Sequence, residues 1–259
     1  MKILILLFCM MSMTKVFAQD QQAMPTEEHA KQHEHGKHHG HGKHHGHGKH
    51  HGHGKHHGHM PHDFNHPEKW VDILNDPKRD EWQQPKVVID QLQLKPTDII
   101  GDLGTGAGYF IPHLLEKIPQ GKLYAMDVAD RLLAHIDAQM KEKGITQVST
   151  IWISEDDLKL PAQTLDKLLI VNTWHHLPQN ATYINRVMDL VKKDGALYLV
   201  EFTMEAQQGP PKEHRITAED LIAQFQKEGY VAQLLATKLP QQYMVMVTKK
   251  SDRNQIEVK

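Results

Sequence analysis

The chain predicts an α/β fold in which a mostly parallel sheet is covered by helices on both faces. Short apolar runs typical of buried strands alternate with helical patterns through residues 86–230. Two more strand patterns follow near the C-terminal end. This order indicates a doubly wound sheet in which one strand is antiparallel to the rest.

Each expected element has a local reason in the sequence. The expected strands are short runs rich in β-branched and long apolar residues, at 97–104, 122–128, 147–154, 165–173, 196–203, 231–239 and 242–249. The expected helices carry apolar residues three and four apart, at 87–94, 108–118, 129–144, 181–195 and 217–230. Pro112 is tolerated in a first turn, and Thr217 is the expected N-cap of the last helix. Gly144 and Gly195 are expected to end the helices that precede them.

These elements together predict a Rossmann-like, seven-stranded, doubly wound sheet. In such sheets, ligands bind at the carboxyl ends of the strands, near the point where the strand order reverses. Residues that follow the expected strands are therefore the first candidates for a functional site.

A glycine-rich turn follows the first expected strand, in the sequence DLGTGAGYF. It contains Asp102, Gly104, Gly106 and Gly108 just before a helix, where free backbone N–H groups are available. A dinucleotide fingerprint would need a glycine in place of Tyr109, and no phosphate-binding Gly-Lys-Ser/Thr sequence is present. An acid before alternating glycines suits a ligand with an ammonium group and no phosphates. A turn used only for tight packing is the alternative.

Two further groups of acids follow the second and third expected strands. Asp127 lies where a carboxylate can accept hydrogen bonds from both hydroxyls of a ribose. The alternative is a helix N-cap, formed by Asp127 or by Asp130. Asp156 and Asp157 lie where they could bind an adenine amino group, or they are solvated loop acids. Acids after three successive strands predict a nucleoside site.

Residues 86–249 resemble the class I S-adenosylmethionine-dependent methyltransferases in element order and in motifs. DLGTGAG is similar to their glycine loop, Asp127 to their ribose-binding acid, and the run from Asp156 to Pro161 to their adenine loop. LDKLLIVNTWHHL and DGALYLVEF are similar to their fourth and fifth strands. The resemblance implies that S-adenosylmethionine is the methyl donor and that the acceptor attacks its methyl group directly, in line with the bond to sulfur. The donor-binding residues it implies are Asp102, Gly104, Thr105, Gly106, Gly108, Asp127, Val128, Asp156, Asp157 and Asn172.

The implied chemistry needs a base only when the methyl acceptor must lose a proton. Candidate catalytic residues on the strand-end face are His175, His176, Glu201 and His214. We expect one ring of the vicinal pair His175 and His176 to face the pocket and the other to pack or to hydrogen bond. His214 with Glu201 could form a structural pair, or a metal site if a third ligand lies nearby. The acceptor expected from the resemblance is a small molecule.

Residues 64–85 are expected to form an ordered lead-in, which contains the sequence DPKRDEWQQP. Arg79 and Gln83 could fold over the pocket as lid residues, or they could be ordinary surface residues. Trp70 and Trp82 are expected to anchor the segment in the core. The domain proper is expected at 86–250, with a tail at 251–259.

The first eighteen residues have the pattern of a secretory signal peptide. Lys2 precedes an apolar run, and small residues lead to a cleavage site after Ala18. A lipoprotein would use Cys9, but the bulky Phe8 precedes it. The expected protein is therefore periplasmic or secreted, with no membrane anchor after cleavage. It would then have no cysteine, because Cys9 is the only one in the chain.

Residues 19–63 form a His/Gly/Lys-rich arm in which GKHHGH occurs four times between Gly36 and His59. The arm has no apolar face to bury, so it is expected to be disordered without a ligand. Imidazole is a ligand for nickel, zinc and copper(II), which makes metal binding the functional interpretation and a passive linker the alternative. The candidate metal ligands are His38, His39, His41, His44, His45, His47, His50, His51, His53, His56, His57 and His59.

The charge balance does not suggest a nucleic-acid partner, because the formal net charge is −2 and basic residues cluster only in the arm. The sequence therefore predicts a methyltransferase that uses S-adenosylmethionine on a small molecule and carries a metal-binding arm. The alternative is an exported metal-buffering protein whose methyltransferase-like domain is a binding scaffold.

Overall fold

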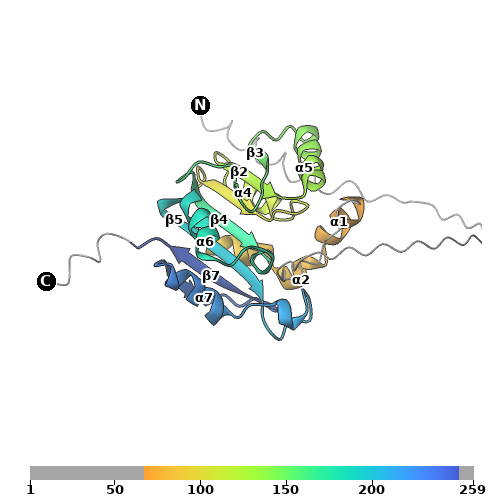
Figure 1. Ribbon diagram of the computed structural model, residues 1–259. Helices are drawn as coiled ribbons and strands as arrows, with labels where there is room; N and C mark the ends of the chain where they lie inside the picture. The colour runs from red at the N-terminus through yellow and green to blue at the C-terminus, as the bar shows by residue number, and fades with distance from the viewer. Residues whose placement is uncertain (1–66, 251–259) are drawn as a thin grey trace, which may run out of the picture. The chain divides into compact units, whose positions relative to one another are not determined.

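The computed structural model describes residues 67–250 of the chain (Figure 1). The predicted signal peptide, the His-rich arm with its candidate metal ligands, and the tail at 251–259 lie outside the described residues. The predicted lead-in contains two short helices, α1 (Pro67–Leu74) and α2 (Arg79–Gln83).

A seven-stranded sheet forms the centre of the described structure, in the order β3-β2-β1-β4-β5-β7-β6. Its strands are β1 (Ile99–Leu103), β2 (Lys122–Asp127), β3 (Val148–Trp152), β4 (Leu165–Val171), β5 (Val191–Phe202), β6 (Val231–Leu234) and β7 (Gln242–Thr248). Among these seven strands, β7 is the one that runs antiparallel to its neighbours, β5 on one side and β6 on the other. The predicted fold class is confirmed. The strand order reverses at β1, which pairs with both β2 and β4.

The remaining helices connect the strands. They are α3 (Pro85–Gln91), α4 (Ile111–Lys117), α5 (Asp130–Glu142), α6 (Ala181–Leu190) and α7 (Ala218–Lys227), with short 3-10 turns η1 (Trp174–His176) and η2 (Lys212–His214). Thr217 caps α7 as predicted, because its side chain accepts a hydrogen bond from the backbone N–H of Asp220. Asn180 caps α6 in the same way. Within residues 67–250, no helix is long and apolar enough to cross a membrane.

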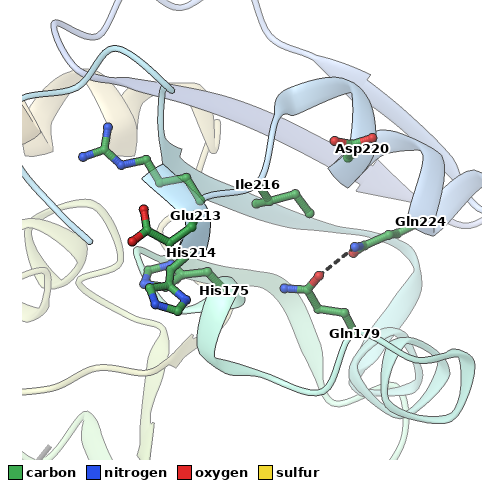
Figure 2. Close-up of a pocket in the computed structure, with 8 residues that line it drawn as sticks. His175, Gln179, Glu213, His214, Ile216, Asp220 and Gln224 are labelled. Carbon is green, nitrogen blue, oxygen red and sulfur yellow. Dashed lines mark hydrogen bonds between the residues drawn. The ribbon is translucent and has the colours of Figure 1, made fainter. Parts of the chain in front are cut away.

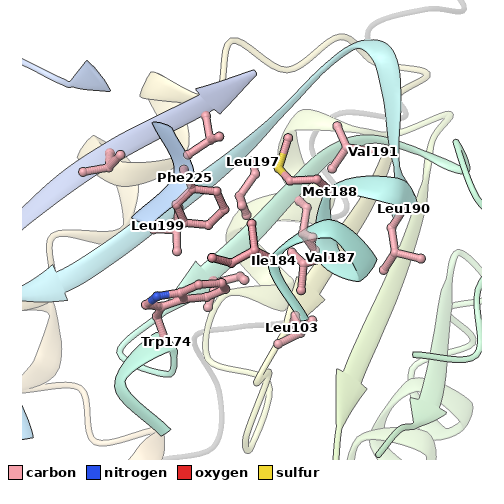
Figure 3. Packing of buried hydrophobic residues seen from close by; sticks show 14 of the residues in the cluster. Leu103, Trp174, Ile184, Val187, Met188, Leu190, Val191, Leu197, Leu199 and Phe225 are labelled. Carbon is pink, nitrogen blue, oxygen red and sulfur yellow. The ribbon is translucent and has the colours of Figure 1, made fainter. Parts of the chain in front are cut away.

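Alternation along the central strands divides the core into two layers. Leu168 and Ile170 of β4 pack with residues of α6 and α7 on one face of the sheet. Leu169 and Val171 point to the other face, where they pack with residues of α3, α4 and α5. Figure 3 shows the first layer, in which side chains of α6 and β5 meet Trp174 and Phe225. Each central strand is therefore buried on both faces, as in other parallel sheets.

The boundary between α6 and β5 differs from the prediction. We expected the helix to continue to Gly195, but it ends at Leu190, and Val191 already has extended backbone angles of φ −81° and ψ 135°. Val191 is fully buried in the core, which holds the chain against Leu165 of β4. A Cβ atom at Gly195 would lie 2.7 Å from the carbonyl oxygen of Asp166. Gly195 therefore permits close approach of two strands and does not end the helix.

Candidate active site

The glycine loop after β1 lies at the carboxyl edge of the sheet, where the strand order reverses. Gly104 has φ +80°, and a Cβ atom there would lie 2.3 Å from Oγ1 of Thr173. Only glycine combines this backbone conformation with this contact. The glycine loop therefore rests directly against the segment that follows β4.

Asp102 is buried beneath the loop, near the end of β1. Its Oδ2 accepts a hydrogen bond of 2.8 Å from Oγ1 of Thr105. Burial raises the pKa of Asp102 to about 7, and the nearby charge of Asp127 adds to this, whereas the Thr105 hydroxyl and the Arg79 guanidinium oppose it. An ammonium group bound here would favour the carboxylate form, which fits the amino end of S-adenosylmethionine.

Asp127 links the end of β2 to the same loop. Its Oδ2 accepts the backbone N–H of Gly106 at 2.8 Å, and its Oδ1 accepts that of Ala129 at 2.9 Å. Burial raises its pKa, and these backbone hydrogen bonds oppose the rise. Helix α5 begins at Asp130 without a side-chain cap, so neither acid is the N-cap considered as an alternative. Each oxygen of Asp127 can accept one more hydrogen bond, as a ribose diol requires.

An exposed apolar pair lies next to Asp127. Val128, a predicted donor-binding residue, is 55% exposed. Trp152, at the end of β3, is 58% exposed, and its Nε1 donates to the carbonyl oxygen of Val128 at 3.0 Å. A flat apolar ring exposed beside the predicted ribose-binding acid suits an adenine. Trp152 was not among the predicted site residues, although it lies near the carboxyl end of an expected strand.

The two acids that follow β3, Asp156 and Asp157, lie in a more solvated place. The side chain of Asp156 is fully exposed, with one oxygen 4.0 Å from Nη1 of Arg186. Asp157 forms an exposed ion pair with Lys159, whose hydrogen bonds lower the pKa of Asp157. Their role toward adenine stays a prediction.

The lead-in lies against the glycine loop. Nδ2 of Asn75 donates to the carbonyl oxygen of Ala107 at 3.0 Å. The guanidinium of Arg79 lies 4.1 Å from the centre of the Tyr109 ring and donates to the carbonyl oxygen of Leu74. Burial lowers the pKa of Arg79, and nearby groups including Asp102 oppose this. Arg79 is therefore packed over the loop, as a lid residue would be.

Gln83 is fully buried and is not a surface residue. It belongs to a closed ring of three amides, which we call the amide ring. Gln83 donates to Gln242 at 2.8 Å, Gln242 donates to Asn172 at 2.5 Å, and Asn172 donates to Gln83 at 3.1 Å. The ring joins the lead-in to the ends of β4 and β7. Trp82 is only partly buried, with its ring 5.5 Å from that of Phe202.

Asn172 was predicted to bind the donor, and the structure shows it bonded within the protein. It has φ +52°, a left-handed conformation that asparagine tolerates better than most residues. Its backbone N–H donates to the carbonyl oxygen of Val200 at 2.8 Å. Its position beside the glycine loop is consistent with donor contact as well, which stays a prediction.

The candidate catalytic residues lie beyond the ends of β4 and β5. Nδ1 of His175 lies 2.8 Å from Oε2 of Glu201, and the two side chains are 5% and 3% exposed. Glu201 thus pairs with His175, which corrects the pairing with His214 considered from the sequence. The ring of the exposed His176 lies 4.1 Å from that of His175. No group of three His, Cys, Asp or Glu side chains within the described part of the chain is arranged to hold a metal ion.

A cavity of about 380 Å³ adjoins this pair (Figure 2). His175 and the exposed His214 both line it. The other lining residues are Gln179, Glu213, Arg215, Ile216, Asp220 and Gln224. The cavity is the size of a site for a small polar molecule.

The strand order, the glycine loop and the two buried acids define the class I methyltransferase fold. Residues 100–195 match the family described as "Methyltransferase domain". A curated relative, the uncharacterized methyltransferase YdaC of Bacillus subtilis, is 25% identical over 142 residues, which are 55% of this chain and 76% of YdaC.

Solved structures share the fold. A SAM-dependent methyltransferase from Aquifex aeolicus superposes with a TM-score of 0.64 at 24% identity, over 70% of this chain and 97% of its own. The YcgJ protein of Bacillus subtilis superposes with a TM-score of 0.52 at 13% identity, over 65% and 99% of the two chains. The domain match and the YdaC relative support a methyltransferase that uses S-adenosylmethionine as its methyl donor, and the solved structures show the fold.

Proposed function

We propose that this methyltransferase acts on a small molecule that occupies the cavity beside His175. The cavity carries the proposal, because His175, which follows the end of β4, lines it and its walls are polar. When bound, S-adenosylmethionine supplies an electrophilic methyl group on a sulfonium centre. On this proposal, Asp102 binds its ammonium group, Asp127 its ribose hydroxyls, and Trp152 packs against its adenine.

Calorimetry tests the donor site. The purified protein should bind S-adenosylmethionine and S-adenosylhomocysteine, and Asp127→Ala should weaken both by about 10- to 100-fold, because charged hydrogen bonds contribute about 1.5–3 kcal/mol. Asp90→Ala is the matched control, since Asp90 lies on α3 in an exposed ion pair with Lys117. Folded protein that binds neither ligand would contradict the proposal.

The size of the acceptor is tested with methyl-labelled donor and a cell extract. After incubation, the extract is dialysed, and label is measured on both sides of the membrane. If the acceptor is a small molecule, more label should cross the dialysis membrane with the wild-type protein than with the Asp127→Ala control. Label retained on protein or nucleic acid contradicts the small-molecule assignment.

We also propose that residues 19–62 bind nickel, zinc or copper(II), and that the protein is exported to the periplasm or secreted. The repeated His-His-Gly-His units support the first statement, and the leader pattern at residues 1–18 supports the second. Equilibrium dialysis on protein with and without residues 19–62 tests the arm, and equal metal uptake by both forms would show a linker. Cell fractionation tests export, and N-terminal sequencing of the purified mature chain tests cleavage after residue 18.

A further inference from the structure

Glu201 is a buried carboxylate with one principal partner. It lies near the end of β5 with its Oε2 bonded to Nδ1 of His175, and its Oε1 accepts the backbone N–H of His175 at 3.4 Å. A carboxylate accepts hydrogen bonds, so Nδ1 of His175 carries the proton that it donates. Nε2 is then the nitrogen with a lone pair, and it can take up a proton.

His175 lies close to the glycine loop. Asp102 of β1 is level with Leu169 of β4, which is level with Tyr198 of β5. Glu201 lies farther toward the carboxyl edge on the same strand. Thr173, two residues before His175, is the residue against which Gly104 packs. The histidine–carboxylate pair therefore lies at the strand-end edge where the glycine loop meets the segment after β4.

Several other polar groups of the cavity wall are already bonded within the protein. The guanidinium of Arg215 donates to five backbone carbonyl oxygens, those of Thr203, Met204, Ala206, Gln208 and Pro210, at 2.8–3.4 Å. Gln224 donates to Gln179 at 2.8 Å and accepts from Nε1 of Trp174 at 3.1 Å. Asp220 accepts from the hydroxyl of Thr217 at 2.8 Å. These groups shape the wall, whereas Nε2 of His175, a residue that also lines the cavity, takes no part in the bond to Glu201.

We propose that His175 is the general base of this enzyme, that Glu201 is its positioning residue, and that the acceptor presents a hydroxyl group in the cavity. This inference rests on the proposed small-molecule acceptor. A neutral hydroxyl is a weak nucleophile, and it gains strength as it loses its proton.

The hydroxyl proton passes to Nε2 of His175 while the oxygen forms a bond to the methyl carbon. The bond between that carbon and the sulfonium sulfur breaks, and its electron pair stays on sulfur. The products are a methyl ether, S-adenosylhomocysteine and a His175 imidazolium, which the Glu201 carboxylate stabilises until the proton leaves to water.

The experiment compares two acceptors of the same shape, phenol and thiophenol, in full-length protein at about pH 8. Phenol keeps its proton there, like a tyrosine with a pKa of about 10, whereas the aromatic thiol is largely ionised and needs no base. Methyl transfer from labelled donor is measured for wild type, His175→Gln, Glu201→Gln and a control, His135→Gln. His135 lies on α5, bonded to Gln139. S-adenosylhomocysteine binding by each variant verifies that it is folded.

We expect His175→Gln to lower phenol methylation by about 10²- to 10⁴-fold and thiophenol methylation by no more than about threefold. Glu201→Gln should also lower phenol methylation more than thiophenol methylation. Equal losses on both acceptors, or no loss, overturn the base assignment. Wild-type protein that binds donor but does not methylate phenol overturns the hydroxyl assignment. Failure to bind donor at all would instead contradict the proposed function.

Discussion

Two buried carboxylates, Asp102 and Asp127, lie beside the glycine loop, and they differ in the hydrogen bonds that they accept. Both oxygens of Asp127 accept backbone N–H groups, whereas Asp102 accepts one hydroxyl, from Thr105. Asp102 is therefore the acid whose charge depends most on a bound cation. Its pKa of about 7 brings the change of charge into the neutral range.

Donor binding should consequently depend on pH through Asp102. An ammonium group favours the carboxylate, so affinity for S-adenosylhomocysteine should rise with pH and level off above about 7. At one pH unit below that value the affinity should be about tenfold weaker, because only about a tenth of Asp102 is ionised. Calorimetry from acid to neutral pH measures the profile, and Asp102→Asn should flatten it. A wild-type profile as flat as that of the variant would contradict this role.

The same shift affects the stability of the ligand-free protein in the opposite direction. A carboxyl group whose pKa is higher in the folded state binds its proton more tightly there than in the unfolded chain. The contribution of Asp102 to the free energy of unfolding should therefore fall as pH rises from about 4 to about 7 and then stay constant. Urea unfolding of wild type against Asp102→Asn over this range isolates that contribution. A contribution that rises with pH would contradict the assigned shift.

A substitution at Gly104 tests the contact between the loop and the segment after β4. Gly104→Ala forces an alanine into a left-handed backbone conformation. It also places a Cβ atom within 2.8 Å of three Thr173 side-chain atoms. Gly144→Ala is the matched control, with φ +64° but no atom within 4 Å of the added Cβ. The control should cost about 1–2 kcal/mol in urea unfolding, and Gly104→Ala at least 1 kcal/mol more. Equal costs would show that the contact relaxes freely.

At the scale of elements, the amide ring connects parts of the chain that are remote in sequence. It joins α2 to the residue after β4 and to the first residue of β7, across separations of up to 159 residues. The Arg79 guanidinium also donates to Gln83, at 3.2 Å, so the ring and the cover over the glycine loop are continuous. Opening the lead-in requires these bonds to break.

Gln83→Ala should loosen the lead-in. It removes one member of the amide ring and leaves a donor of Asn172 and an acceptor of Gln242 without that partner, at a cost of about 1–3 kcal/mol in the free energy of unfolding. Hydrogen exchange should also speed up in α1 and α2 relative to the central strands. Gln226→Ala, at an exposed position on α7, is the control. A loss no larger than that of the control would show that water replaces the ring.

Local patterns were sufficient to predict the elements but not these contacts. The periodicity of β4 and the acid-glycine turn after β1 are short-range signals, and the predicted fold is confirmed. The amide ring and the pair of His175 with Glu201 depend on which strands become neighbours in the sheet. The local patterns of a single sequence do not reveal that order. Gly195 was misinterpreted for the same reason, since its role is to admit a neighbouring backbone.

For the whole molecule, the repeat arm and the methyltransferase domain should behave independently. Removing residues 19–62 should change neither the midpoint of urea unfolding nor the affinity for S-adenosylhomocysteine. The metal bound by the full chain should decline as pH falls through about 6.5, because only neutral imidazole is a ligand. Dialysis against nickel at several pH values measures the second effect. A shift in domain stability on deletion would show that the two parts are coupled.

The bonds of Arg215 have a consequence for how this enzyme could diversify. One guanidinium fixes the path of residues 203–210 through main-chain oxygens only. The side chains of that stretch take no part in these bonds, so they can change while the loop keeps its path. Gly209 is the exception, because it has φ +88° and an added Cβ atom would lie 2.5 Å from the Phe202 ring. Relatives that retain this arginine can therefore vary the other side chains of the loop and still hold its main chain in place. A lysine, with a single ammonium group, could not preserve that tolerance.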